Sequence, residues 1–117
     1  MSSYRDLQVW QKSIRLVTDI YKATDAFPSR EMYGLTSQVR RAAVSVASNI
    51  AEGQGRRSKQ EFRQFLSHAR GSLMEVETQI VIAQELHYLN QDTAGKLLDS
   101  SAEVGRMLNG LMHSMAA

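Results

Sequence analysis

Apolar residues recur at steps of three and four along nearly the whole chain, a spacing typical of amphipathic helices. The pattern predicts four helices, over residues 6–26, 35–52, 59–89 and 93–114. The connections between them are short, and long helices joined by short connections run antiparallel. The sequence therefore predicts an all-α fold with one domain over residues 1–117, an up-down-up-down four-helix bundle.

The first predicted helix has Asp6 as a candidate N-cap and one apolar seam at heptad-like spacing. Its seam consists of Leu7, Trp10, Ile14, Val17 and Tyr21, and Leu16 and Ile20 widen it. Helix 35–52 carries an apolar seam of Val39, Ala43, Val46 and Ile50, with Val44, Ala47 and Ala51 covering much of the remainder. A single bundle buries about half of each helix, so we expect this one to meet another subunit as well.

A second seam of helix 35–52 is polar and contains Ser45 and Asn49. If buried without partners, each would cost roughly 1–3 kcal/mol, so we expect partners on the third helix, among Arg70, Ser72 and Glu75. Glu52 could pair with Arg41 or Arg70. We favour a buried network that fixes the helix register, and a polar ligand pocket is the alternative. The candidate network comprises Arg41, Ser45, Asn49, Glu52, Ser72 and Glu75.

Positive charge is concentrated in one part of the chain, although the net charge is only +2. Residues 40–70 hold seven Arg and Lys residues against Glu52 and Glu61, a local charge of +5, whereas residues 71–117 carry −4. Such a region favours a polyanion or the acidic half of a neighbouring copy, and arginine suits phosphate. A solvated face is the alternative. The candidate nucleic-acid-binding residues are Arg56, Arg57, Lys59, Arg63 and Arg70.

Motifs for catalysis, metal binding or membrane insertion are not found in the sequence. The chain has no cysteine, its three histidines lack ligand spacing, and the Gly53-x-Gly55 pair lacks the ending of a phosphate loop. No segment approaches the roughly 20 apolar residues of a membrane span or resembles a signal peptide. We expect a cytoplasmic protein that is not an enzyme and uses no metal or cofactor.

Three stretches, "LQVWQKS", "YGLTSQVRRAAVSVASNIAEG" and "EFRQFLSHARGSLMEVETQI", closely resemble a known family. These are the small four-helix-bundle proteins encoded by intervening sequences in bacterial 23S ribosomal RNA genes. The resemblance covers about residues 4–90. It implies a left-handed bundle assembled as a homopentamer, and a similarity to the accessory variability determinant of diversity-generating retroelements, which binds nucleic acid and a reverse transcriptase. It transfers no catalytic residue.

Three hypotheses about function follow. The first is a non-enzymatic pentamer that binds nucleic acid, RNA rather than DNA, through a basic end. The second is a protein-interaction scaffold or accessory subunit, for example for a reverse transcriptase. The third is an enzyme or small-molecule binder that uses the seam of Ser45, Asn49 and Glu52, for which the sequence offers the least support.

Overall fold

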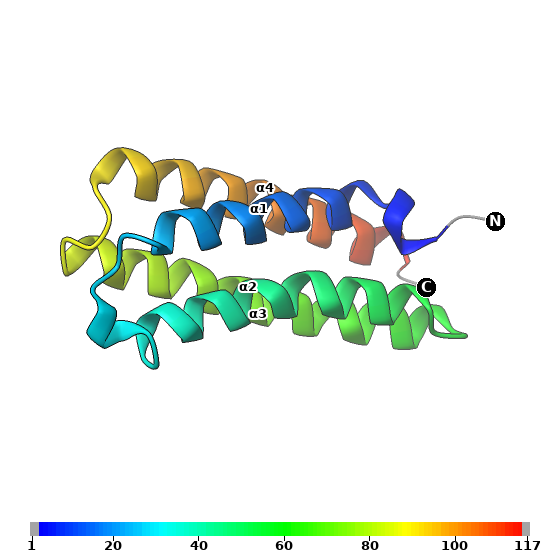
Figure 1. The fold of residues 1–117 in the computed structure, drawn as a ribbon. Helices are drawn as coiled ribbons and strands as arrows, with labels where there is room; N and C mark the ends of the chain where they lie inside the picture. The colour runs from blue at the N-terminus through cyan, green and yellow to red at the C-terminus, as the bar shows by residue number, and fades with distance from the viewer. Residues whose placement is uncertain (1–2, 116–117) are drawn as a thin grey trace.

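In a computed structural model, which describes residues 3–115, four long helices lie side by side and consecutive helices run in opposite directions (Figure 1). The long helices are α1 (Gln8–Thr24), α2 (Leu35–Gln54), α3 (Lys59–Glu85) and α4 (Gln91–Ser114), and the 3₁₀ turns η1 (Tyr4–Asp6) and η2 (Ser29–Glu31) precede α1 and α2. The bundle measures 45 × 23 × 20 Å. The predicted all-α four-helix bundle is confirmed.

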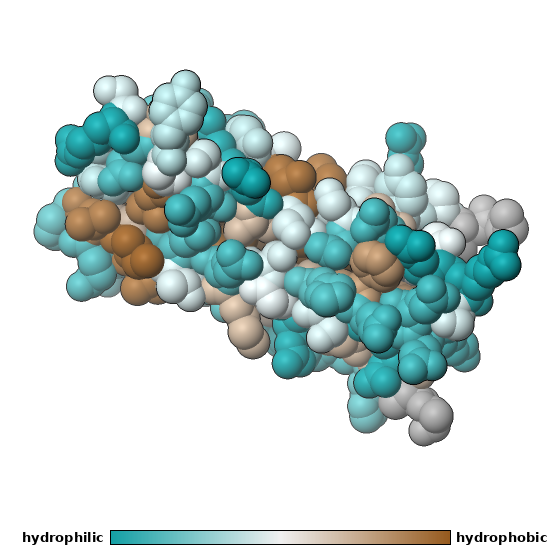
Figure 2. Space-filling view, turned by 90° about the horizontal axis from the view of Figure 1, so that it is seen from below, coloured by the Kyte–Doolittle hydropathy of each residue, from teal (hydrophilic) through white to brown (hydrophobic). Residues whose placement is uncertain are grey.

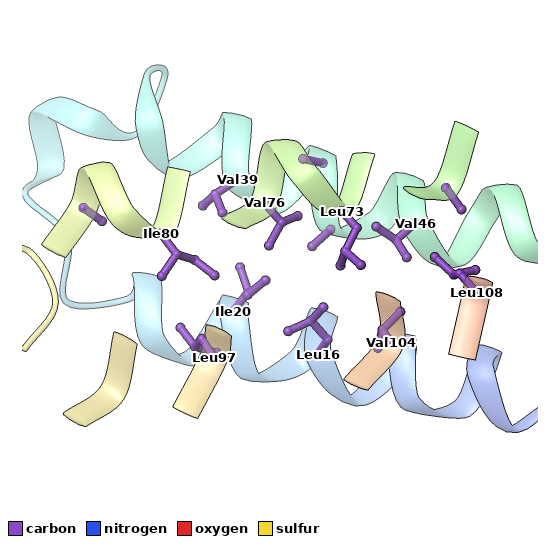
Figure 3. Packing of buried hydrophobic residues seen from close by; sticks show 14 of the residues in the cluster. Leu16, Ile20, Val39, Val46, Leu73, Val76, Ile80, Leu97, Val104 and Leu108 are labelled. Atoms are coloured by element: carbon purple, nitrogen blue, oxygen red, sulfur yellow. The ribbon is translucent and has the colours of Figure 1, made fainter. Parts of the chain in front are cut away.

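The core is a single cluster of aliphatic side chains contributed by all four helices (Figure 3). The predicted apolar seam of α2 lies in it, and Val46 and Ile50 have no exposed surface. On α3 and α4 the residues that repeat at helical spacing are likewise buried, among them Leu66, Val76 and Leu108. Each helix therefore presents one stripe to the common core, as the spacing requires.

The main line of the predicted α1 seam is wrong, whereas Leu16 and Ile20, which were predicted to widen it, are buried. Ile14 and Tyr21 are exposed to 37% and 42%, and Trp10 is only half-buried. The buried stripe is the neighbouring one, which consists of Val9, Ser13, Leu16, Ile20 and Thr24. Two stripes therefore run side by side on α1. The more apolar one, which contains Trp10 and Ile14, lies outside the core and next to α2.

Several of the predicted helix ends need correction. Asp6 is not the N-cap of α1, because its carboxylate accepts a hydrogen bond from the Ser3 backbone in a capping box that closes η1. Leu7 is the N-cap residue of α1, and its side chain makes no capping hydrogen bond. The α2 helix continues to Gln54, beyond the predicted end at residue 52.

The third helix ends at Glu85, four residues before its predicted end at residue 89, because His87 adopts the left-handed conformation with φ 63°. The His87 N–H donates to the Gln84 carbonyl oxygen and the Tyr88 N–H to that of Ala83, the two bonds of a Schellman motif. The turn is tied to the η2 segment, since the Tyr88 hydroxyl donates to Glu31 at 2.8 Å. This turn and η2 lie at the end of the bundle opposite the α2–α3 turn (Figure 1).

Candidate nucleic-acid interface

The turn between α2 and α3 carries the first group of predicted binding residues. Arg56, Arg57, Lys59 and Arg63 are all exposed. Ser58 caps α3 by accepting a hydrogen bond from the Glu61 N–H, so the segment changes abruptly from turn to helix. Ion pairs found within residues 3–115 join other residues, so none of these four cations is neutralised by a carboxylate within 4 Å. We call these four residues the basic end.

An aromatic ring underlies this surface, which the sequence pattern did not indicate. The Arg56 guanidinium lies over the Phe65 ring, with Cζ 4.6 Å from the ring centroid. Phe65 in turn makes an edge contact with His68, at 6.1 Å between centroids. Arg56 and Phe65 are nine residues apart across the turn, so only the folded hairpin brings them together. The contact holds one guanidinium of the basic end in place.

Arg70 does not join the basic end in the way its spacing suggested. Its Nη1 donates to Asn109 Oδ1 of α4 at 3.0 Å. The side chain therefore crosses toward the α3–α4 side, and it does not reach Ser45 or Asn49 as we expected. Arg70 is still exposed, but its hydrogen bond directs it toward α4.

Arg5 is a cation at this end of the bundle that the sequence analysis missed. The η1 turn packs against α2, and Tyr4 lines a hollow together with Ala51 near the C-terminal end of that helix. Gln11 fixes the turn by donating to the Arg5 carbonyl oxygen at 2.8 Å. Seen from the side of α2 and α3, this end is mostly hydrophilic and apolar side chains gather toward the other end (Figure 2).

The polar seam of α2 forms a smaller network than predicted. Ser45 and Ser72 share a hydrogen bond of 2.9 Å, and Asn49 Nδ2 donates to the Ser45 carbonyl oxygen at 2.8 Å and to Ser45 Oγ at 3.0 Å. All three side chains are half-buried rather than buried. They line the groove between α2 and α3, where water can reach them, so the expected cost of burial is largely avoided.

The charged members of the predicted network lie outside it. Arg41, Glu52 and Glu75 are exposed, and none of them makes a side-chain hydrogen bond or ion pair within residues 3–115. The predicted ion pair of Glu52 with Arg41 or Arg70 is therefore wrong. Long exposed side chains lose conformational entropy when they pair, and solvent screens the attraction, so nothing draws these three together.

The apolar stripe of α1 that faces outward joins α2 to form one apolar surface, which we call the α1–α2 face. Apolar residues of both helices line it, together with Tyr4 of η1 and one serine, and all but buried Ala47 are exposed or half-buried: Tyr4, Trp10, Ile14, Val17, Val44, Ala47, Ser48 and Ala51. Val44 is 41% exposed although it lies in the middle of a helix. Large contiguous apolar surfaces are typical of interaction sites.

Within the described part of the chain, neither a metal-ligating cluster nor a membrane-crossing helix is present. Residues 3–115 contain no group of three or more His, Asp or Glu side chains placed to hold a metal ion. No helix within these residues has the length and hydropathy of a membrane-crossing segment.

Comparison with known proteins gives one family and one fold. Residues 5–110 match the family model described as 23S rRNA-intervening sequence protein. A crystal structure of a protein of unknown function from the S23 ribosomal protein family of Bacteroides thetaiotaomicron is similar, with a TM-score of 0.80. Sequence identity is 20%, and the match covers 89% of this chain and 97% of that one. No curated protein sequence is similar to this chain.

Proposed function

Because the chain belongs to the family of 23S rRNA-intervening sequence proteins, we propose that it is a non-enzymatic, self-assembling protein that binds nucleic acid, RNA in preference to DNA, through its basic end. One observation supports this most directly. Arg56, Arg57, Lys59 and Arg63 crowd one turn and the start of one helix, yet no carboxylate pairs with them within residues 3–115. Uncompensated cations of this density attract a polyanion.

Binding through these contacts is expected to be largely independent of sequence and to weaken steeply with salt, because each neutralised phosphate releases counterions. We would measure fluorescence anisotropy of a labelled structured RNA and a matched DNA duplex at several salt concentrations. The test variant replaces Arg56, Arg57, Lys59 and Arg63 with Gln. The expected result is weaker binding and a salt slope that falls by about one for each phosphate contact removed.

A matched control changes the same number of charges elsewhere. Arg15, Lys22, Arg30 and Arg106 are also exposed and also lack an ion pair within residues 3–115, so their replacement by Gln alters net charge equally. If both variants lose affinity equally, net charge rather than the basic end governs binding. If the unaltered protein binds neither nucleic acid at low salt, the proposed function is wrong and a protein scaffold becomes the better hypothesis.

Self-assembly is the second part of the proposal, and the α1–α2 face supports it. The face exposes apolar surface of Val44, Ile14 and Trp10 that a second copy would bury. The expected assembly is the homopentamer that the family resemblance implies. Multiple copies would repeat the basic end on one rigid body, so that weak contacts act together.

Light scattering coupled to size-exclusion chromatography tests the assembly. Val44→Lys places a charge in the α1–α2 face and should shift the mass toward that of the monomer. Asp99→Lys places a lysine at an exposed position of α4 and should leave the mass unchanged. An unaltered protein that elutes as a monomer at micromolar concentration would refute the assembly.

A further inference from the structure

The groove between α2 and α3 is continuous and polar along much of the bundle. It consists of two adjoining hollows that share Ser45, Ser72 and Glu75. One hollow extends to Gln38 and Gln79, and the other to Ser67 and His68 beside the Arg56–Phe65 stack. From Gln38 to Asn49, α2 rises roughly 16 Å, and the groove ends beside His68, which contacts the ring beneath Arg56.

Hydrogen-bond acceptors in this groove lack donors. Asn49 Nδ2 donates hydrogen bonds to Ser45 of α2, whereas Asn49 Oδ1 makes no hydrogen bond within residues 3–115. Gln79 Oε1 is buried and has no hydrogen-bond partner in the same residues. Gln79 Oε1 is enclosed by the protein and out of reach of a ligand, whereas half-buried Asn49 lines the groove, so its Oδ1 can accept from a ligand that brings N–H or O–H groups. Phosphate alone offers no such donor.

Cations and rings flank these acceptors. Arg41 lines the hollow near Gln79, and Arg56 lies over Phe65 at the far end. His68 lines the second hollow and touches the Phe65 ring at its edge. Guanidinium and imidazole planes are surfaces on which unpaired bases stack, while the arginines also neutralise phosphates.

Small residues of both helices are among those that line the groove. Ala42 and Ser45 of α2 meet Gly71 and Ser72 of α3 along it. Neighbouring helix axes lie only about 8–10 Å apart, so a groove between them accommodates an extended strand rather than a double helix. We propose that the α2–α3 groove binds single-stranded RNA, with 2′-hydroxyl or base N–H groups donating to Asn49 Oδ1. This inference rests on the proposed nucleic-acid function and names the substrate class of the site.

Gly71 provides a test that leaves the fold intact. A Cβ at Gly71 would meet no atom within 4 Å, so Gly71→Leu extends into the groove without a clash. Gly110 on α4 has the same open surroundings and lines neither hollow, which makes Gly110→Leu the matched control. Both changes favour the helix, so neither is expected to unfold the protein.

Anisotropy would be measured with a labelled ten-nucleotide single-stranded RNA, the DNA of the same sequence, and an RNA duplex, using the full chain. Gly71→Leu should displace one stacked base and its hydrogen bonds. The affinity for single-stranded RNA should therefore fall by about tenfold or more. Duplex affinity should stay within about twofold, since the basic end is intact, and Gly110→Leu should change neither.

Other outcomes overturn the inference and leave the proposed function standing. Equal affinity of Gly71→Leu and the unaltered protein for single-stranded RNA would show that the strand does not use the groove. Equal binding of the RNA and DNA single strands would show that no 2′-hydroxyl is recognised. A lower assembly mass for Gly71→Leu alone would assign the groove to a contact between copies. Absence of any binding by the unaltered protein would instead refute the proposed function itself.

Discussion

Gly53 of α2 lies so close to Phe65 of α3 that a Cβ built on the glycine would be 2.7 Å from the phenylalanine Cβ. Phe62 approaches the same point, with Cδ1 at 2.9 Å and its carbonyl oxygen at 3.3 Å. The glycine therefore allows the two helices to converge just before their turn. This convergence sets the position of Phe65, on which Arg56 rests.

We expect Gly53→Ala to destabilise the bundle by about 1–3 kcal/mol, because the added methyl group overpacks the contact by more than its helix propensity gains. Urea unfolding followed by circular dichroism measures the change. The control is Gly110→Ala, where the Cβ meets open space and the free energy of unfolding should rise by up to about 1 kcal/mol. Equal behaviour of the two variants would contradict the close approach.

His87 holds the left-handed position that ends α3. A residue with a Cβ is strained there by roughly 1–2 kcal/mol, and glycine is not. His87→Gly should therefore raise the free energy of unfolding by about 1 kcal/mol, which thermal melting would detect. As a control, His68→Gly within α3 should lower it by a similar amount. A decrease for His87→Gly would refute the assignment of strain to this turn.

Ser101 is fully buried, and its hydroxyl oxygen has no hydrogen-bond partner within residues 3–115. Replacing it with alanine removes an unsatisfied group, so Ser101→Ala should stabilise the protein by about 1 kcal/mol. Ser13 is equally buried, but its hydroxyl donates to the Trp10 carbonyl oxygen at 2.7 Å. Ser13→Ala should gain less than Ser101→Ala in chemical denaturation. The reverse order would mean that Ser101 has a partner in solution.

Glu31 joins the two turns at the end of the bundle opposite the basic end. The Leu35 N–H and then the Tyr88 hydroxyl donate to its carboxylate and lower its pKa from the ordinary value of 4.5, against the opposing effect of desolvation. Because the pKa is lower in the folded state, this stabilisation is complete above the unfolded-state value and is lost as pH falls through the folded-state pKa.

The melting temperature of Glu31→Gln should therefore lie below that of the unaltered protein at neutral pH, and the difference should shrink as pH falls below about 4.5. Tyr88→Phe removes one of the two hydrogen bonds and should show a smaller difference with the same direction. A difference between Glu31→Gln and the unaltered protein that stays constant from pH 7 to pH 3 would refute the role of the ionised carboxylate.

Periodicity alone located the helices and the core stripe of α2, but on α1 it placed the main seam one stripe away from the core. The two stripes of that helix differ by Ser13, which lies in the real core, and by Trp10 and Ile14, which do not. Hydrophobicity predicts which residues are buried. It does not predict whether the core of their own bundle or the surface of another copy buries them. A helix with two apolar stripes is therefore a signal for assembly as well as for the core.

The candidate site was partly accessible from the sequence. Arg56, Arg57, Lys59 and Arg63 are contiguous, so a count of charges finds them. Phe65 could not be assigned to them, because its ring contacts Arg56 only after Gly53 lets α2 and α3 converge. The ion pair predicted for Glu52 does not form for a similar reason. Sequence spacing shows which side chains share a helix face, but it does not show whether they are exposed to solvent, which screens their attraction.

The η1 turn, the α2–α3 turn and the last turn of α4 lie at one end of the bundle (Figure 1). A purification tag fused to either terminus would therefore sit beside the basic end, and a polyhistidine tag would gain positive charge as pH falls toward about 6.5. Tyr33 lies at the other end and is 96% exposed. Since the chain has no cysteine, Tyr33→Cys would give a single fluorophore site far from the basic end, and an untagged protein labelled there would report binding without taking part in it.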